Sequence, residues 1–157
     1  MRQLARELGR RLQHQGYRLA TAESCTGGWV AQVVTSIAGS SAWFERGFVT
    51  YSNAAKLEML GVKAETLARF GAVSAEAAIE MAEGALTHSR SQVSVAITGI
   101  AGPEGGTADK PVGTVWFAWA GGGRPPVTVC KHFEGGRGSV RRQAVETALR
   151  GLIERLQ

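Results

Sequence analysis

The sequence has little cysteine, no long apolar run and no cluster of metal-binding side chains. Its two cysteines, Cys25 and Cys130, form no disulfide framework or metal motif, which favours a reducing, cytoplasmic setting. No apolar stretch reaches the length that spans a bilayer, so we expect no membrane association. The first residues, 1–7, are typical of an amphipathic helix and not of a signal peptide.

Several signatures of catalysis and cofactor binding are also missing. The sequence has no Walker loop, no GxGxxG fingerprint and no pair of carboxylates suited to glycoside chemistry. The net charge of +5 permits an anionic partner, but no basic run is longer than a pair and no aromatic residues are interleaved with it. Nucleic-acid binding is therefore disfavoured, and a small anionic ligand is favoured. We expect no cofactor.

The 157 residues fit a single domain over 1–157 that buries a core without a disulfide or metal. Helical periodicity, β-rich runs and glycine or serine boundaries predict an alternating order of elements. The expected helices are 1–15, 27–37, 54–60, 64–70, 75–88 and 138–156, and the expected strands are 17–23, 46–51, 93–98, 112–120 and 127–133. This order predicts an α/β fold whose mixed, mostly parallel sheet of about five strands is covered on both faces.

The stretch from Thr21 to Gly28 carries the strongest functional signal. It joins an expected strand to an expected helix through small residues, at the sheet edge where α/β proteins bind ligands. Ser24 and Thr26 provide hydroxyls, while Gly27 and Gly28 let a ligand approach the backbone. The helix start also offers N–H groups and a positive dipole end that suit an oxyanion or phosphate. An ordinary cap and turn would explain the same residues.

Two further loops follow strands and should meet this one at the same edge of the sheet. They are 51–56 and 98–103, and the first contains Lys56. If Asn53 caps its helix, Lys56 lies in the first turn, where the helix dipole and burial would lower the pKa of the amine. A neutral lysine could act as a general base toward Ser24, although a solvated surface lysine is the commoner case. Tyr51 fits either a core aromatic or a hydrogen-bonding group beside the site.

Cys25 is a rival nucleophile, but it would need a histidine partner. The three histidines are on segments with no obvious reach to this edge, at His14, His88 and His132. A serine–lysine arrangement is therefore preferred over one with histidine.

Anion binding has two further candidates. The loop from Thr98 to Gly102 could hold a carbonyl oxygen or phosphate with its N–H groups and the Thr98 hydroxyl, or could be a plain bend. Arg137 and Arg141 are four residues apart and share a helix face, which fits either a phosphate clamp or a solvated surface.

Taken together, the motifs resemble the CinA carboxyl-terminal domain family over nearly the whole chain. The motifs are Ala22-Glu23-Ser24-Cys25-Thr26-Gly27-Gly28, Gly47-Phe48-Val49-Thr50-Tyr51-Ser52-Asn53 with Lys56, and Thr98-Gly99-Ile100-Ala101-Gly102-Pro103. The chain is similar to the stand-alone form, because it has no room for the other domain of longer relatives. The resemblance implies a three-layer α/β/α sandwich.

The resemblance also implies hydrolysis of nicotinamide mononucleotide to nicotinate mononucleotide and ammonia, in pyridine-nucleotide salvage. The family's catalytic pair corresponds to Ser24 and Lys56, and Tyr51 is expected as a third catalytic residue that either assists the proton transfer or positions the pair. The residues expected to bind the substrate are Thr26, Gly27, Gly28, Asn53, Thr98, Gly99, Ala101, Gly102 and Arg141. A non-catalytic nucleotide-binding module and a protein associated with DNA damage or competence remain as alternatives. A homo-oligomer contact through Trp43, Phe44 and Trp119 competes with core packing of the same residues.

Overall fold

The computed structural model describes residues 1–157 and has six α-helices and one five-stranded sheet. The helices are α1 Arg2–Gln15, α2 Trp29–Thr35, α3 Asn53–Leu60, α4 Ala64–Phe70, α5 Ala75–Thr87 and α6 Arg137–Arg155. The strands are β1 Leu19–Glu23, β2 Phe44–Val49, β3 Val93–Gly99, β4 Thr114–Gly121 and β5 Arg124–His132. Every predicted helix and strand is present, with boundaries shifted by up to three residues.

The sheet has the strand order β2-β1-β3-β4-β5. Strand β1 is parallel to both β2 and β3, and β4 is antiparallel to β3 and β5. The predicted mixed sheet of five strands is therefore confirmed. The three parallel strands end on one side of the sheet, so the loops that follow Glu23, Val49 and Gly99 are brought together there.

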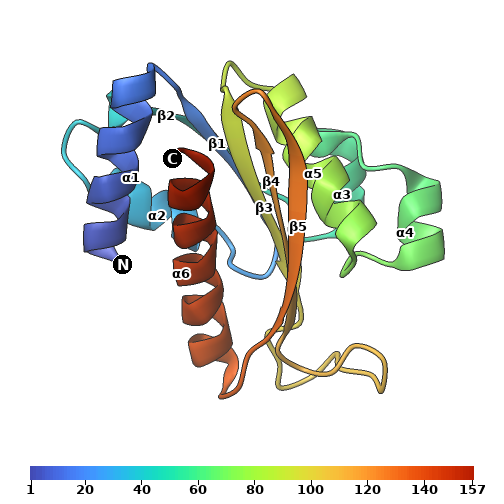
Figure 1. Ribbon diagram of the computed structural model, residues 1–157. Coiled ribbons are helices and arrows are strands. Elements are labelled where there is room, and N and C mark those ends of the chain that lie inside the picture. Colours follow the sequence, from blue (N-terminus) through green and yellow to red (C-terminus); the bar gives the residue numbers. More distant parts are fainter.

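Helices cover both faces of the sheet, as the prediction of three layers requires. Figure 1 shows α1, α2 and α6 on one face and α3, α4 and α5 on the other. The face under α1, α2 and α6 carries the larger core, which includes Leu12, Trp43 and Leu149. The face under α5 is lined by small side chains such as Ala20 and Ala96, which allow that helix to lie close to the sheet.

Local sequence explains where the helices near the site begin and end. Ser52 and Ser74 precede α3 and α5, and their hydroxyls accept hydrogen bonds from the N–H groups of Ala55 and Ala77. Gly61 ends α3 with a φ of 69°, a left-handed conformation that glycine adopts without steric cost. Ser52 and Asn53 were together expected at the start of α3, and of the two it is Ser52 that caps the helix.

The large aromatic residues that might have formed an oligomer contact lie in the core. Trp43 and Trp119 are buried, and Phe44 packs against the same cluster.

Strand β5 forms one edge of the sheet and contains two consecutive prolines, Pro125 and Pro126.

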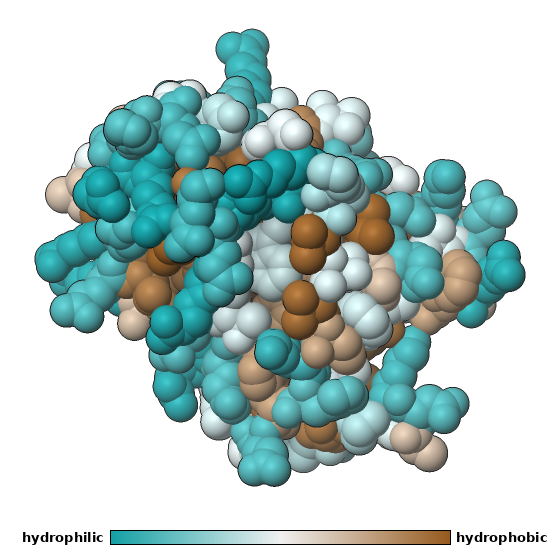
Figure 2. Space-filling model, viewed as in Figure 1, coloured by the Kyte–Doolittle hydropathy of each residue, from teal (hydrophilic) through white to brown (hydrophobic).

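No helix has the length and apolar character that crossing a membrane would require. The face shown in Figure 2 is mostly hydrophilic, with hydrophobic residues exposed in small groups.

Candidate active site

The site lies where β1 and β3 end side by side. The N–H group of Ser24 donates to the carbonyl oxygen of Ile97 at 3.0 Å, which holds the loop after β1 against β3. A pocket of about 260 Å³ opens at this point. It is lined by Ser24, Cys25, Tyr51, Gly99, Ile100, Ala101, Gly102, Glu104, Gly105 and Arg137. The three loops that were expected to meet at this edge all contribute to it or contact it.

Ser24 is in direct contact with Lys56. The Lys56 Nζ lies 3.0 Å from the Ser24 Oγ, 2.9 Å from the carbonyl oxygen of Thr50 and 3.4 Å from that of Tyr51. Lys56 is only 1% exposed, and no carboxylate forms a salt bridge with it. The predicted contact between the amine and the hydroxyl is therefore present, and the amine has no acidic partner.

Burial lowers the pKa of Lys56 from its ordinary value, because an ammonium group loses its hydration inside the protein. The two carbonyl oxygens can accept both N–H groups of a neutral amine, which leaves the nitrogen lone pair for the Ser24 hydroxyl. The position of Lys56 in the sequence predicts that the helix dipole lowers this pKa as well. Burial is the main cause in the structure, where Lys56 is the fourth residue of α3.

The neighbouring thiol is poorly suited to act as the nucleophile. Burial raises the pKa of Cys25 to about 11, so the group is a thiol near neutral pH. None of the three histidines lines the pocket. His88 instead lies 2.8 Å from the carbonyl oxygen of Gly84, and His132 lies near Thr114. These placements agree with the preference for serine and lysine over a histidine-dependent pair.

Tyr51 and Arg137 form the outer wall of the pocket. Tyr51 is 61% exposed, so its reading as a core aromatic is wrong. Arg137, at the start of α6, donates to the Tyr51 hydroxyl at 3.0 Å and to the carbonyl oxygen of Gly102 at 2.9 Å. One guanidinium thus links the loop after β2 to the loop after β3 and remains beside the pocket opening.

Arg141, one helical turn further along, does not line the pocket. It donates to the carbonyl oxygens of Cys25 and Thr26 at 3.0 and 3.1 Å, and its guanidinium stacks 5.4 Å from the ring centroid of Trp29. Two of its three side-chain nitrogens, Nε and Nη2, are engaged by the loop that carries the serine. Of the two arginines predicted as a clamp, Arg137 is the one at the pocket, and Arg141 braces the loop behind Ser24.

The loop after β1 is also fixed from within by Glu23, whose importance the sequence did not reveal. Its buried carboxylate accepts hydrogen bonds from the Thr26 hydroxyl at 2.7 Å and from the N–H groups of Val30 and Ala31 at 2.9 and 3.1 Å. The start of α2 is therefore neutralised by the protein's own carboxylate. The expectation that this helix end and the Thr26 hydroxyl bind the ligand's anion does not fit this arrangement.

Gly27 and Gly28 form the turn into α2 and do not line the pocket. Both have positive φ angles, 58° and 99°, which a residue with a side chain would adopt only with strain. Their role in the structure is to let the chain turn sharply after Ser24.

Only some of the residues expected at the loop after β3 face the pocket. The Thr98 hydroxyl donates to the carbonyl oxygen of Ala72 at 2.8 Å and is buried, so it is not directed to a ligand. Gly99, Ala101 and Gly102 do line the pocket, and the N–H groups of Ala101 and Gly102 have no acceptor within the protein. Asn53 is exposed at the start of α3, outside the pocket lining.

Comparison with known proteins places this geometry in a known group. The model of the family described as "CinA C-terminal domain" matches residues 1–156. The chain is 57% identical over 150 residues to the nicotinamide-nucleotide amidohydrolase PncC of Escherichia coli K12, covering 96% of this chain and 91% of that protein. It is 48% identical over 151 residues to the protein of the same name from Pseudomonas putida, covering 96% and 94%.

A solved structure is also similar to this chain over almost its whole length. The competence/damage inducible protein CihA from Agrobacterium tumefaciens superposes with a TM-score of 0.96 at 48% identity, covering 99% of this chain and 95% of that one.

Proposed function

The chain belongs to the CinA C-terminal domain family, and from that premise we propose that it is a nicotinamide-nucleotide amidase. It would convert nicotinamide mononucleotide to nicotinate mononucleotide and ammonia, a step of pyridine-nucleotide salvage. The observation that carries the proposal is the 3.0 Å contact between the Lys56 amine and the Ser24 hydroxyl, made without an acidic partner for the lysine. The names of the relatives from Escherichia coli and Pseudomonas putida, both nicotinamide-nucleotide amidohydrolases, support the substrate.

In the proposed first step, the neutral amine of Lys56 takes the proton of the Ser24 hydroxyl, and the oxygen attacks the carboxamide carbon. The amide oxygen becomes negatively charged as the tetrahedral intermediate forms. The unpaired N–H groups of Ala101 and Gly102 are the candidates to stabilise it, since both residues line the pocket that contains Ser24. Removing one such donor typically costs about 10²–10³ in turnover.

The protonated Lys56 then returns its proton to the leaving nitrogen, so that ammonia departs and an acyl ester on Ser24 remains. Water attacks this ester, with Lys56 again taking the proton, and nicotinate mononucleotide leaves as Ser24 recovers its hydrogen. The scheme uses only groups of the protein and water. The carbonyl oxygens of Thr50 and Tyr51 hold the amine in place throughout both steps.

We assign the substrate's phosphate to Arg137, because its guanidinium lies at the pocket wall. Tyr51 orients that guanidinium through its hydroxyl and so acts as a positioning residue. Gly99, Ala101 and Gly102 would contact the substrate through their backbone. Thr26, Gly27, Gly28 and Arg141 would contribute indirectly, by fixing the loop that carries Ser24.

The deciding experiment is an ammonia-release assay with nicotinamide mononucleotide on Ser24→Ala and Cys25→Ala. Ser24→Ala should lose about 10³-fold or more in kcat, as expected for removal of a nucleophile. Cys25→Ala is the matched control, a small neighbouring side chain in the same loop, and should retain activity within about tenfold. If Cys25→Ala is inactive and Ser24→Ala active, a thiol mechanism replaces this one. If the wild-type chain binds the nucleotide but releases no ammonia, the protein is a binding module.

A further inference from the structure

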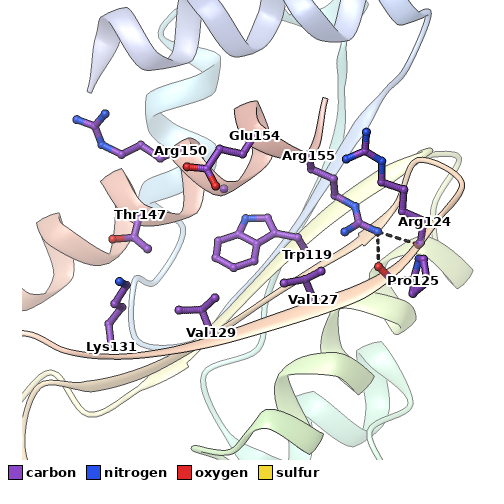
Figure 3. A pocket seen from close by; sticks show the side chains of 11 residues that line it. Trp119, Arg124, Pro125, Val127, Val129, Lys131, Thr147, Arg150, Glu154 and Arg155 are labelled. Carbon is purple, nitrogen blue, oxygen red and sulfur yellow. Dashed lines mark hydrogen bonds between the residues drawn. The ribbon is translucent and has the colours of Figure 1, made fainter. Parts of the chain in front are cut away.

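A second cavity, larger than the pocket at the serine, lies away from Ser24. It has a volume of about 710 Å³ and shares no lining residue with the pocket at the serine. It runs between β5 and α6, because α6 packs against β3 and β4 and leaves the adjoining face of β5 uncovered (Figures 1 and 3). Its volume falls in the range of about 300–1,000 Å³ that is usual for small-molecule sites.

The middle of this groove is apolar and rigidly built. Figure 3 shows Val127, Val129 and Trp119 between the two ends of the groove. The Trp119 indole N–H donates to the carbonyl oxygen of Ala148 in α6 at 3.1 Å. A Cβ atom at Gly151 would lie 2.2 Å from the indole ring, so glycine is required for α6 to lie on it. These contacts provide a fixed hydrophobic surface, with Val127 half exposed to solvent.

One end of the groove carries two arginines and no acid. The Arg155 side chain is 9% exposed and donates to the carbonyl oxygens of Gly121, Arg124 and Pro125 at 2.7–3.0 Å. Its Nη1 makes no hydrogen bond within the protein. Burial, and after it the neighbouring charge of Arg124, lowers the pKa of Arg155. An arginine remains charged even so. Arg124 itself donates to the carbonyl oxygen of Gln157 at 3.0 Å.

The other end is also cationic. Lys131 from β5 and Arg150 from α6 lie there on either side of Thr147 (Figure 3). Glu154 is the one acid among the lining residues, and none of the lining cations forms a salt bridge. The groove therefore combines four cationic side chains with one carboxylate around an apolar centre.

We propose that the groove between β5 and α6 is a second ligand site, for a phosphorylated small molecule with a flat apolar ring, as nucleotides have. The phosphates bind to Arg124 and the free Nη1 of Arg155, because arginine forks match phosphate oxygens. The ring lies against Val127 and Val129. Lys131 and Arg150 bind a further polar or anionic group at the far end. Strand pairing connects the groove to the pocket at Ser24, because Lys131 is in register with Val115, which is paired with Gly99.

The test is calorimetric titration of the full chain with ATP at fixed, low ionic strength. The diagnostic variant is Arg124→Glu, which places a carboxylate beside Arg155 and removes one phosphate donor. We expect its dissociation constant for ATP to rise about tenfold or more, as for the loss of a charge-assisted hydrogen bond. Arg6→Glu, an exposed arginine of α1, changes the net charge equally and should stay within about twofold. Lys131→Glu should weaken ATP binding to an intermediate degree.

Arg137→Glu distinguishes ATP binding at the groove from ATP binding at the serine pocket. This variant should leave ATP binding at the groove unchanged. In NMR spectra, the Trp119 indole N–H signal is identified by its absence from the spectrum of Trp119→Phe. This signal should shift on addition of ATP, and it should shift less with inorganic phosphate, which lacks the ring. The proposal fails if ATP does not bind at millimolar concentration, or binds equally to wild type and Arg124→Glu. It also fails if wild type is a dimer that Arg124→Glu dissociates, because a second copy would then occupy the groove. None of these outcomes depends on ammonia release at Ser24.

Discussion

Two basic side chains are buried in this molecule without an acidic partner, and burial affects them differently. Lys56 is 1% exposed and Arg155 is 9% exposed, and each donates to backbone carbonyl oxygens. In both cases burial lowers the pKa from its ordinary value. The ordinary pKa of arginine lies well above that of lysine, so the same direction of shift favours loss of the proton at lysine and leaves arginine charged.

Burial thus favours a neutral base at Lys56, whereas Arg155 keeps its charge in a similar environment. At Lys56, loss of the proton leaves a lone pair directed to the Ser24 hydroxyl. At Arg155, the delocalised guanidinium keeps its charge, and three carbonyl oxygens accept the hydrogen bonds that water would otherwise accept. The first environment suits proton transfer, and the second suits the binding of an anion.

The largest effect is expected when the lysine amine is removed but its volume is kept. Lys56→Met should lower kcat for ammonia release by about 10²–10⁴, the usual contribution of a general base. Its free energy of unfolding should stay within about 1 kcal/mol of wild type, because removal of the desolvated amine offsets the loss of the donor to the carbonyl oxygens of Thr50 and Tyr51. Kinetics and denaturant unfolding of the same preparation measure both quantities. Retained activity would remove Lys56 from the mechanism.

Removing the buried guanidinium should have a larger consequence for stability, because Arg155 donates to three carbonyl oxygens. Arg155→Met leaves the carbonyl oxygens of Gly121, Arg124 and Pro125 without their donor. We expect the free energy of unfolding to fall by about 1.5–3 kcal/mol, as for the loss of charged hydrogen bonds. Urea denaturation monitored by tryptophan fluorescence would measure it. A variant as stable as wild type would mean that the carbonyl contacts contribute nothing net, and the contrast with Lys56 would disappear.

The smallest effect concerns pH. Because the pKa of Lys56 is lower in the folded than in the unfolded state, the unfolded chain binds more protons between the folded pKa and 10.5. The stability of wild type relative to Lys56→Met should therefore rise with pH across that window and stay level below it. Activity should rise with pH as the amine loses its proton. Thermal unfolding and kcat/KM measured against pH test both, and a pH-independent difference in stability would contradict a lowered pKa.

The sequence was sufficient to predict the fold and the central contact, because both follow from local patterns. Parallel strands place their following loops at one edge, so Ser24 and Lys56 could be brought together without knowledge of packing. The caps at Ser52 and Ser74 and the small residues around Ser24 are likewise local features.

The roles of the surrounding polar side chains could not be predicted, because they depend on which neighbours the fold supplies. Thr98 and Thr26 were expected to face a ligand, but Ala72 and Glu23 take their hydroxyls. Arg137 and Arg141 are indistinguishable in a helical pattern, and only the packing of α6 directs one to the pocket and the other to the loop behind it. The capping role of Glu23 had a local signal, since an acid three residues before Thr26 can accept hydrogen bonds from the next helix start, but nothing in the sequence showed that its carboxylate would be buried.

The two prolines of β5 limit how this protein can associate with itself. An edge strand normally offers a row of N–H and C=O groups to which a strand from another molecule can add. Pro125 and Pro126 have no N–H to offer, and charged side chains at Arg124 and Lys131 flank the rest of the strand. Extension of the sheet from β5 into a continuous intermolecular ribbon is therefore disfavoured, which protects concentrated protein from aggregation along this edge.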